Sequence, residues 1–168
     1  MRRALATQPG LEVNLVEPAP ALVAAPLARP ALAEDHAAGL DLILEGFLLH
    51  HGRPRHLNLP DIGRRVLAGD YCYAHGLVWV AETGDLRVID LLADLVAMSA
   101  ALVSTGDRDG LGPLWRTTIT AIAHDDPSFD ERLRTAKDAL RARSDIALLV
   151  ALAEALPAAP DLEEALHA

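Results

Sequence analysis

The chain has 168 residues, which suits a single domain that buries roughly 70% of the surface it exposes when unfolded. Hydrophobic residues, largely Ala and Leu, make up 51% and aromatic residues only 4%, so helix formers outnumber the residues that build sheets. The formal net charge of −9 gives no general attraction to phosphate backbones, which argues against nucleic-acid binding. We therefore expect an all-α protein.

The cysteine content and the lengths of the apolar runs predict a cytoplasmic protein. Cys72 is the only cysteine, so no internal disulfide can form. Polar residues and Pro9 interrupt the apolar stretch after Arg3, which does not fit a secretory signal peptide. The longest apolar runs, such as 146–153, are far shorter than the ~20 residues of a membrane-spanning helix. We expect no membrane span.

Residues 1–30 are expected to form a proline-rich N-terminal arm, and residues 31–168 a single helical-bundle domain. Each proline of the arm lacks an amide donor and disfavours helix in the residue before it. The pattern leaves open whether the arm packs on a partner or is poorly ordered.

The first helix is predicted from about Pro30 to His51. Its apolar side chains are Leu40, Ile43, Leu44, Phe47 and Leu48, and its solvent face carries Glu34, Asp41 and Glu45. Gly52 and Pro54 end it. Asn58 is then expected to cap the next helix, with Pro60 in its first turn.

Two long apolar helices are predicted over 59–103, joined by a turn at 82–84. The first has two adjacent apolar stripes, and in the second only Asp90 and Asp94 form a polar seam. A helix that is apolar on nearly all sides lies inside a bundle or at a subunit interface. These two helices are therefore expected to be the centre of the fold.

The rest of the chain is predicted to be helical. A loop over 104–110 precedes a helix at 111–123, and Pro127 opens a further helix whose outer surface is rich in arginine and lysine. An apolar helix over 146–156 and a short tail helix follow.

Several polar residues could carry chemistry. Arg53, Arg55 and His56 form a basic loop that could hold a diphosphate, and Arg134 and Lys137 could approach the same ligand; the pattern of both groups favours a solvated surface over this site. Asp70 and His75 are expected in the interior as structural hydrogen-bonding groups.

The acids Asp125, Asp126 and Asp130 imitate a metal-binding motif, but Pro127 starts a helix between them. The sequence contains neither a phosphate-binding glycine loop nor a hydrolase nucleophile motif. No catalytic residue, metal site or cofactor is predicted.

Four strings occur in a familiar order: 52–56 (Gly-Arg-Pro-Arg-His), 66–73 (Val-Leu-Ala-Gly-Asp-Tyr-Cys-Tyr), 84–88 (Gly-Asp-Leu-Arg-Val) and 134–136 (Arg-Thr-Ala). In this order they resemble the trans-isoprenyl diphosphate synthases, in which an Arg-rich loop precedes a Gly-Asp-Tyr helix, a Gly-Asp turn and a Lys-Thr-Ala helix. The resemblance covers about residues 35–156. It implies a truncated isoprenoid-synthase-like bundle that dimerises through two long central helices.

The chain departs from this family at the aspartate-rich motifs, which hold the Mg²⁺ that stabilises the departing diphosphate. Where the first motif is expected the chain reads His50-His51-Gly52, and the second would lie beyond its end. The closest resemblance is therefore to the non-catalytic small subunit of two-component polyprenyl diphosphate synthases. This implies a homodimer or a heterodimer with a catalytic prenyl synthase subunit, with prenyl diphosphate as the ligand in the tunnel. The expected interface residues are Val66, Tyr73, Leu77, Val88, Leu92 and Val96.

Two alternative functions remain open. One is a small metal-dependent helical enzyme acting on diphosphates, which would use 50–56 with Asp125 and Asp126 as a metal site. The other is an isoprenoid-binding homodimer, and composition does not distinguish it from the synthase subunit.

Overall fold

The computed structural model describes residues 34–168, apart from the side chains of residues 34, 35 and 143, and before them Leu5, Gly10, Leu11 and Leu15. Most of the expected arm 1–30 and the start of the first predicted helix lie outside the described residues. The helices are α2 (Glu34–His51), α3 (Ile62–Glu82), α4 (Leu86–Thr105), η2 (Arg108–Gly110), α5 (Leu111–Ala123), α6 (Pro127–Arg143), α7 (Ala147–Glu154) and α8 (Pro160–His167).

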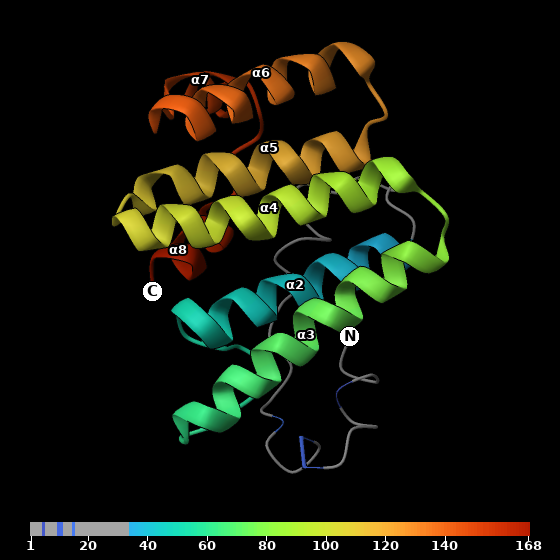
Figure 1. The fold of residues 1–168 in the computed structure, drawn as a ribbon, viewed down its shortest axis with the longest axis vertical. Coiled ribbons are helices and arrows are strands. Elements are labelled where there is room, and N and C mark those ends of the chain that lie inside the picture. The colour runs from blue at the N-terminus through green and yellow to red at the C-terminus, as the bar shows by residue number, and fades with distance from the viewer. Residues whose placement is uncertain (1–4, 6–9, 12–14, 16–33) are drawn as a thin grey trace.

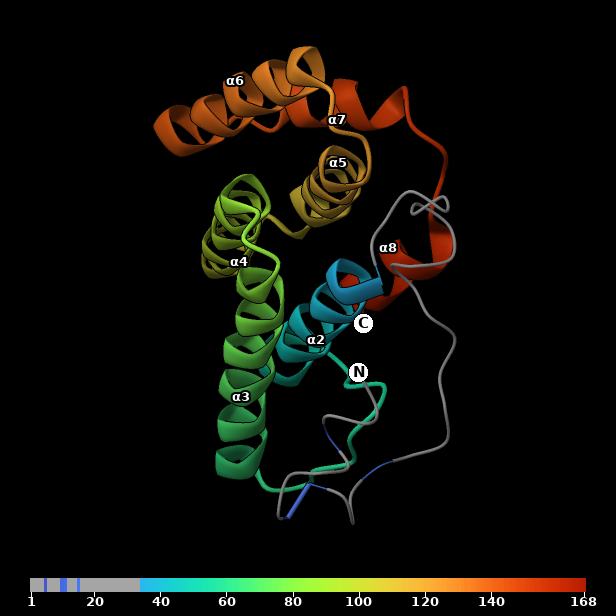
Figure 2. The same ribbon diagram turned by 90° about the vertical axis from the view of Figure 1, so that its right-hand side faces the viewer.

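The described part of the chain contains helices and one isolated bridge, so the predicted all-α class is confirmed. The helices form three layers along the long axis of the molecule: α2 with α3, α4 with α5, and α6 with α7 (Figure 1). The last helix, α8, returns to pack on α5. Helices α3 and α4 meet at a short turn and diverge from it, and Figure 2 shows both on the same side of the molecule, with α4 above α3. Each described helix is too short or too polar to cross a bilayer.

The central helix is α5, where the sequence predicts the two helices over 59–103. Ten of its side chains or glycine positions are buried, and Trp115 Nε1 donates a 3.1 Å hydrogen bond to Ser99 Oγ of α4. By contrast, Leu67 and Val78 of α3 are 70% and 50% exposed. Helix α3 therefore has one face that packs within the chain and a second, apolar face that is exposed to solvent.

Close helix packing joins α2 to α3. Gly39 and Gly46 on α2 lie opposite Gly76 and Gly69 on α3, each pair spaced by one heptad. A Cβ added at Gly76 would lie 2.7 Å from the carbonyl oxygen of Gly39. The two backbones therefore touch where no side chain intervenes.

Capping residues set where the long helices begin. Asp61, rather than the predicted Asn58, caps α3, because its carboxylate accepts a 2.8 Å hydrogen bond from the backbone N–H of Arg64. Pro60 therefore precedes the helix instead of lying in its first turn. Asp85 caps α4 in the same way, with a 3.1 Å bond from Val88 N–H.

A second, smaller apolar cluster involves the N-terminal segment. Leu5 is fully buried there, and the backbone of Leu15 bridges that of Leu57. Arg64 donates a 3.1 Å hydrogen bond to the carbonyl oxygen of Gly10. The buried members of the cluster are Leu5, Leu42, Leu49, Leu57, Leu59, Ala68 and Cys72. The described residues of the arm therefore pack on the chain itself, which is neither of the two alternatives considered for it.

Candidate subunit interface on helices α3 and α4

The outward side of α3 carries an exposed, mostly apolar stripe. Leu67 and Val78 are the most exposed of its large side chains, with Ala74 between them and Ala81 beyond. Steps of three and four residues keep these positions on one side of a helix. Asp70 is the charged residue in the middle of the stripe. We call this surface the α3 face and define it as Gly63, Val66, Leu67, Asp70, Ala74, Leu77, Val78 and Ala81.

Helix α4 also exposes apolar residues, most of them with small side chains. Leu86 at its start is 77% exposed, and Val96 is half-buried beside the main core. Its exposed alanines are Ala93, Ala97, Ala100 and Ala101. Helices α3 and α4 lie on the same side of the molecule (Figure 2).

The six predicted interface residues lie at different depths. Val66 is 40% exposed, and Tyr73, Leu77 and Val96 are half-buried. Val88 and Leu92 are fully enclosed in the main core, because this side of α4 packs on α5. These two side chains therefore cannot contact a partner in this structure, and the candidate interface lies on the outward sides of α3 and α4.

Asp70 and His75 lie elsewhere than predicted. The Asp70 side chain is 65% exposed, and its Oδ1 lies 3.2 Å from Nε2 of His50 on α2. His75 is half-buried and stacks on Tyr71 at a centroid distance of 4.2 Å. The two residues therefore do not share an interior neighbourhood, since successive α3 side chains point to different sides.

The basic loop between α2 and α3 is organised by Glu45. This side chain is 1% exposed, which corrects its expected place on the solvent face. Its carboxylate accepts hydrogen bonds from the backbone N–H groups of Arg55, His56 and Leu57 at 2.9 to 3.2 Å. Burial raises the pKa of Glu45, and these three hydrogen bonds oppose the rise.

The three basic side chains of this loop differ in exposure. Arg53 is exposed, Arg55 is half-buried, and His56 is 6% exposed. Burial lowers the pKa of Arg55, against the opposing effect of nearby Glu45, Asp41 and Asp161. Of these three side chains, Arg53 is the one that is exposed to an incoming diphosphate.

The two basic residues predicted on α6 also differ. Arg134 is exposed and forms ion pairs with Glu131 and Asp138 of its own helix. Lys137 is 2% exposed, with its Nζ 3.6 Å from Oδ2 of Asp94 on α4, and burial lowers its pKa. Arg141 binds the other oxygen of Asp94. The expected solvated surface is thus confirmed for Arg134 and wrong for Lys137.

The structure does not bring the two basic groups together. The loop 52–61 lies at the lower end of the molecule and α6 at the upper end, with α4 and α5 between them (Figure 1). A single diphosphate cannot contact both ends. The predicted diphosphate set therefore divides into two separate groups.

The aspartates before and within α6 bind protein groups. Asp126 caps α6 by accepting from the N–H groups of Ser128 and Phe129. Asp130 holds Arg87 through two hydrogen bonds of 2.5 and 2.9 Å, and Asp125 lies 3.6 Å from the same guanidinium. Within the described residues, no group of three or more His, Cys, Asp or Glu side chains could hold a metal ion.

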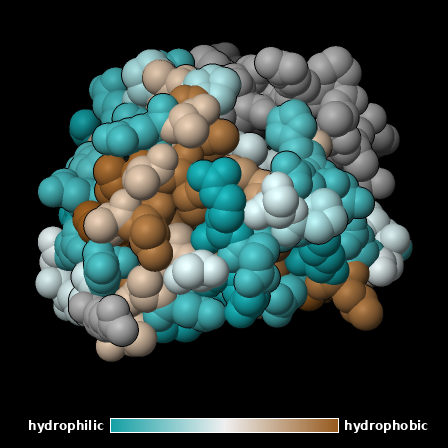
Figure 3. All heavy atoms as spheres, turned by 90° about the horizontal axis from the view of Figure 1, so that it is seen from above, coloured by the Kyte–Doolittle hydropathy of each residue, from teal (hydrophilic) through white to brown (hydrophobic). Residues whose placement is uncertain are grey.

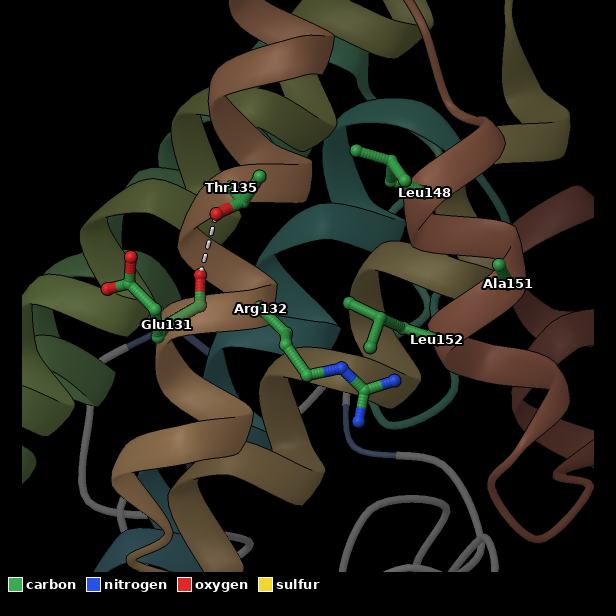
Figure 4. A pocket seen from close by; sticks show the side chains of 6 residues that line it. All are labelled: Glu131, Arg132, Thr135, Leu148, Ala151 and Leu152. Carbon is green, nitrogen blue, oxygen red and sulfur yellow. Dashed lines mark hydrogen bonds between the residues drawn. The ribbon is translucent and has the colours of Figure 1, made fainter.

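An open groove of about 230 Å³ lies between α6 and α7. Seen from this side, hydrophobic residues gather between hydrophilic ones (Figure 3). In the close view, Arg132 extends from α6 toward Leu152, while Glu131 points away from the groove (Figure 4). Its apolar wall consists of Leu148, Ala151 and Leu152. The groove holds one cation and no general acid or base pair.

Sequence reasoning missed three interior polar residues whose spacing contains a signal. Glu45 follows Leu42 by three residues and precedes Leu49 by four, so it shares their buried side of α2. Lys137 stands between Leu133 and Leu140 in the same way, with Leu133 buried and Leu140 half-buried. His50 follows the buried Phe47 by three residues in the last turn of α2, and its side chain is only 17% exposed.

No family model, curated protein or solved structure matches this chain. A functional argument therefore depends on the residues and geometry described above.

Proposed function

We propose that this protein is a non-catalytic, isoprenoid-synthase-like subunit. It associates through the α3 face and the adjoining surface of α4, either with a catalytic polyprenyl diphosphate synthase subunit or with a second copy of itself. In the first case it shapes the wall of the prenyl tunnel.

One observation carries the proposal: the α3 face places Leu67 and Val78 in solvent over several turns of a long, well-capped helix. Exposed apolar surfaces of this kind commonly mark association sites. The sequence string that resembles the synthase family lies on the same helix, and in that family this region forms the subunit interface. The two arguments are independent, since one uses exposure and the other uses sequence order.

The chemistry of the described residues supports a non-catalytic role. Ionisation of an allylic diphosphate needs hard oxygen ligands that hold Mg²⁺. The position of the first aspartate-rich motif is occupied by His50-His51-Gly52, and the acids near α6 cap a helix or bind Arg87. The metal-dependent enzyme and the isoprenoid-binding dimer stay predictions.

Co-expression with a long-chain prenyl synthase encoded in the same genome tests the proposal. We expect a complex by size-exclusion chromatography with light scattering, and a change in the chain length of the products relative to the catalytic subunit alone. A protein that is monomeric at micromolar concentration, both alone and with that subunit, would overturn it.

A further inference from the structure

Helix α7 carries more apolar surface than the core uses. Its last residue, Glu154, is the one charged residue in the helix, so apolar side chains point to every side of it. On the side that faces solvent, Leu148 is 46% exposed and Ala151 is exposed as well. The side chains that the core takes up are Leu149, Leu152 and Ala153. An apolar side of α7 is therefore left in solvent next to α6.

The groove between α6 and α7 has an aliphatic wall on the α7 side and polar residues on the α6 side. Figure 4 shows Leu148 and Leu152 on one side and Thr135 on the other. The Thr135 hydroxyl donates a 2.9 Å hydrogen bond to the carbonyl oxygen of Glu131 on its own helix. Its proton is therefore already used, and Thr135 gives the groove no free donor.

Arg132 supplies the donors that remain in the groove. Its side chain extends from α6 toward Leu152 (Figure 4). The described residues of α6 that form ion pairs are Asp130, Glu131, Arg134, Lys137, Asp138 and Arg141. Arg132 is absent from this set, so its guanidinium can bind an acid from outside this part of the chain.

The acids around Arg132 limit the charge of that ligand. Glu131 is already held by Arg134 at a nitrogen–oxygen distance of 2.5 Å. Hydrogen bonds within the α6 cap lower the pKa of Asp126, and the charge of Arg132 contributes to the same shift. A ligand with several negative charges would thus meet one unpaired cation beside two acids, and like charges repel. A single negative charge matches the groove.

We propose that the groove between α6 and α7 binds a monocarboxylate with a short aliphatic chain. The guanidinium of Arg132 holds the carboxylate through two parallel N–H donors, and the chain lies on Leu148, Ala151 and Leu152. The volume of about 230 Å³ is below the roughly 300 Å³ at which sites for drug-sized ligands begin, which favours a short chain. This site is separate from the α3 face and goes beyond the proposed function.

Titration of the full isotope-labelled chain with octanoate, followed by two-dimensional amide NMR, tests the inference. We expect saturable shift changes confined to α6 and α7, with a dissociation constant of about 1 mM, because one ion pair and one short apolar contact in an open groove bind weakly. Acetate lacks the chain and octanol lacks the charge. Each should bind about tenfold more weakly than octanoate.

Three variants assign the contacts. Arg132→Gln is expected to weaken octanoate binding about tenfold, because the charge-assisted hydrogen bonds are lost. Arg53→Gln removes the same charge from an exposed position at the opposite end of the molecule and should leave binding unchanged (Figure 1). Leu148→Ala shortens the apolar wall and should weaken binding about threefold. All three side chains are exposed, so the variants are expected to fold, which circular dichroism checks.

Four results would overturn the inference. These are no saturable shift changes up to about 10 mM octanoate, changes centred outside α6 and α7, equal binding by R132Q and R53Q, and acetate or octanol binding as tightly as octanoate. None of them alters association through the α3 face, which the co-expression experiment measures separately.

Discussion

Gly39 and Gly76 bring α2 and α3 into backbone contact: a Cβ at Gly39 would lie 2.9 Å from the carbonyl oxygen of Gly76, and the reverse distance is 2.7 Å. This contact fixes the spacing of the helix pair that carries the α3 face. It also explains why glycine occurs four times in these two otherwise strongly helical segments at positions that face each other.

Gly76→Ala is expected to lower the free energy of unfolding by about 2 kcal/mol, because the added methyl group forces the helices apart. Gly63→Ala, on the same helix but exposed, is expected to raise it by about 0.5 kcal/mol through a more restricted unfolded chain. Urea denaturation followed by circular dichroism measures both. Equal effects of the two substitutions would contradict the close contact.

Glu45 anchors the loop between the same two helices. Glu45→Ala leaves three backbone N–H groups without their acceptor, so we expect a loss of about 3 kcal/mol in unfolding free energy. Glu82→Ala, at the exposed end of α3, is expected to change it by less than about 0.5 kcal/mol. Chemical denaturation at pH 7 compares the two, and a loss below about 1 kcal/mol for E45A would show that the loop holds without the carboxylate.

The helices were predictable from the sequence because their ends carry strong local signals. Gly52, Pro54, Pro127 and Pro157 interrupt the backbone hydrogen-bond pattern whatever the rest of the chain does. Asp61 rather than Asn58 caps α3 because of the path that the loop takes after Leu57. That path depends on the hydrogen bond from Leu57 N–H to Glu45, which is a long-range contact. Local patterns therefore gave the elements but not every boundary.

The candidate site was less predictable because burial depends on which helix packs on which. The stripes of α3 and α4 indicated two apolar faces each, but only tertiary structure shows that α5 covers Val88 and Leu92 while Leu67 remains exposed. Likewise, the charge of Lys137 predicts a surface position, but its side chain is buried. The sequence pattern alone does not show which helix packs on which face, and that packing decides which side chains are buried.

Lys137 is expected to decrease stability at neutral pH. Burial lowers its pKa below the ordinary value of 10.5, so the unfolded chain binds the proton more tightly than the folded one. The stability of the unmodified protein should therefore rise with pH through the alkaline range up to that value. Asp94 keeps Arg141 as a partner when the lysine is removed.

Accordingly, Lys137→Met is expected to raise the free energy of unfolding at pH 7 by about 1 kcal/mol and to abolish this alkaline gain. Arg134→Met, on the exposed side of α6, should keep the pH dependence of the unmodified protein. Thermal unfolding between pH 7 and 10 measures both variants. A large loss of stability in K137M would show instead that the ion pair with Asp94 is net stabilising.

A charge placed on the α3 face should separate association from folding. Leu67→Glu is expected to leave the unfolding midpoint nearly unchanged, because the side chain is 70% exposed, and to weaken pairing by more than about tenfold, because a buried unpaired charge opposes contact. Leu148→Glu adds the same charge to an exposed leucine of α7 and should leave pairing unchanged. Light scattering over a concentration series reads out both variants, alone and with the catalytic subunit. If L148E disrupts the complex and L67E does not, the contact lies at the groove between α6 and α7 rather than on α3.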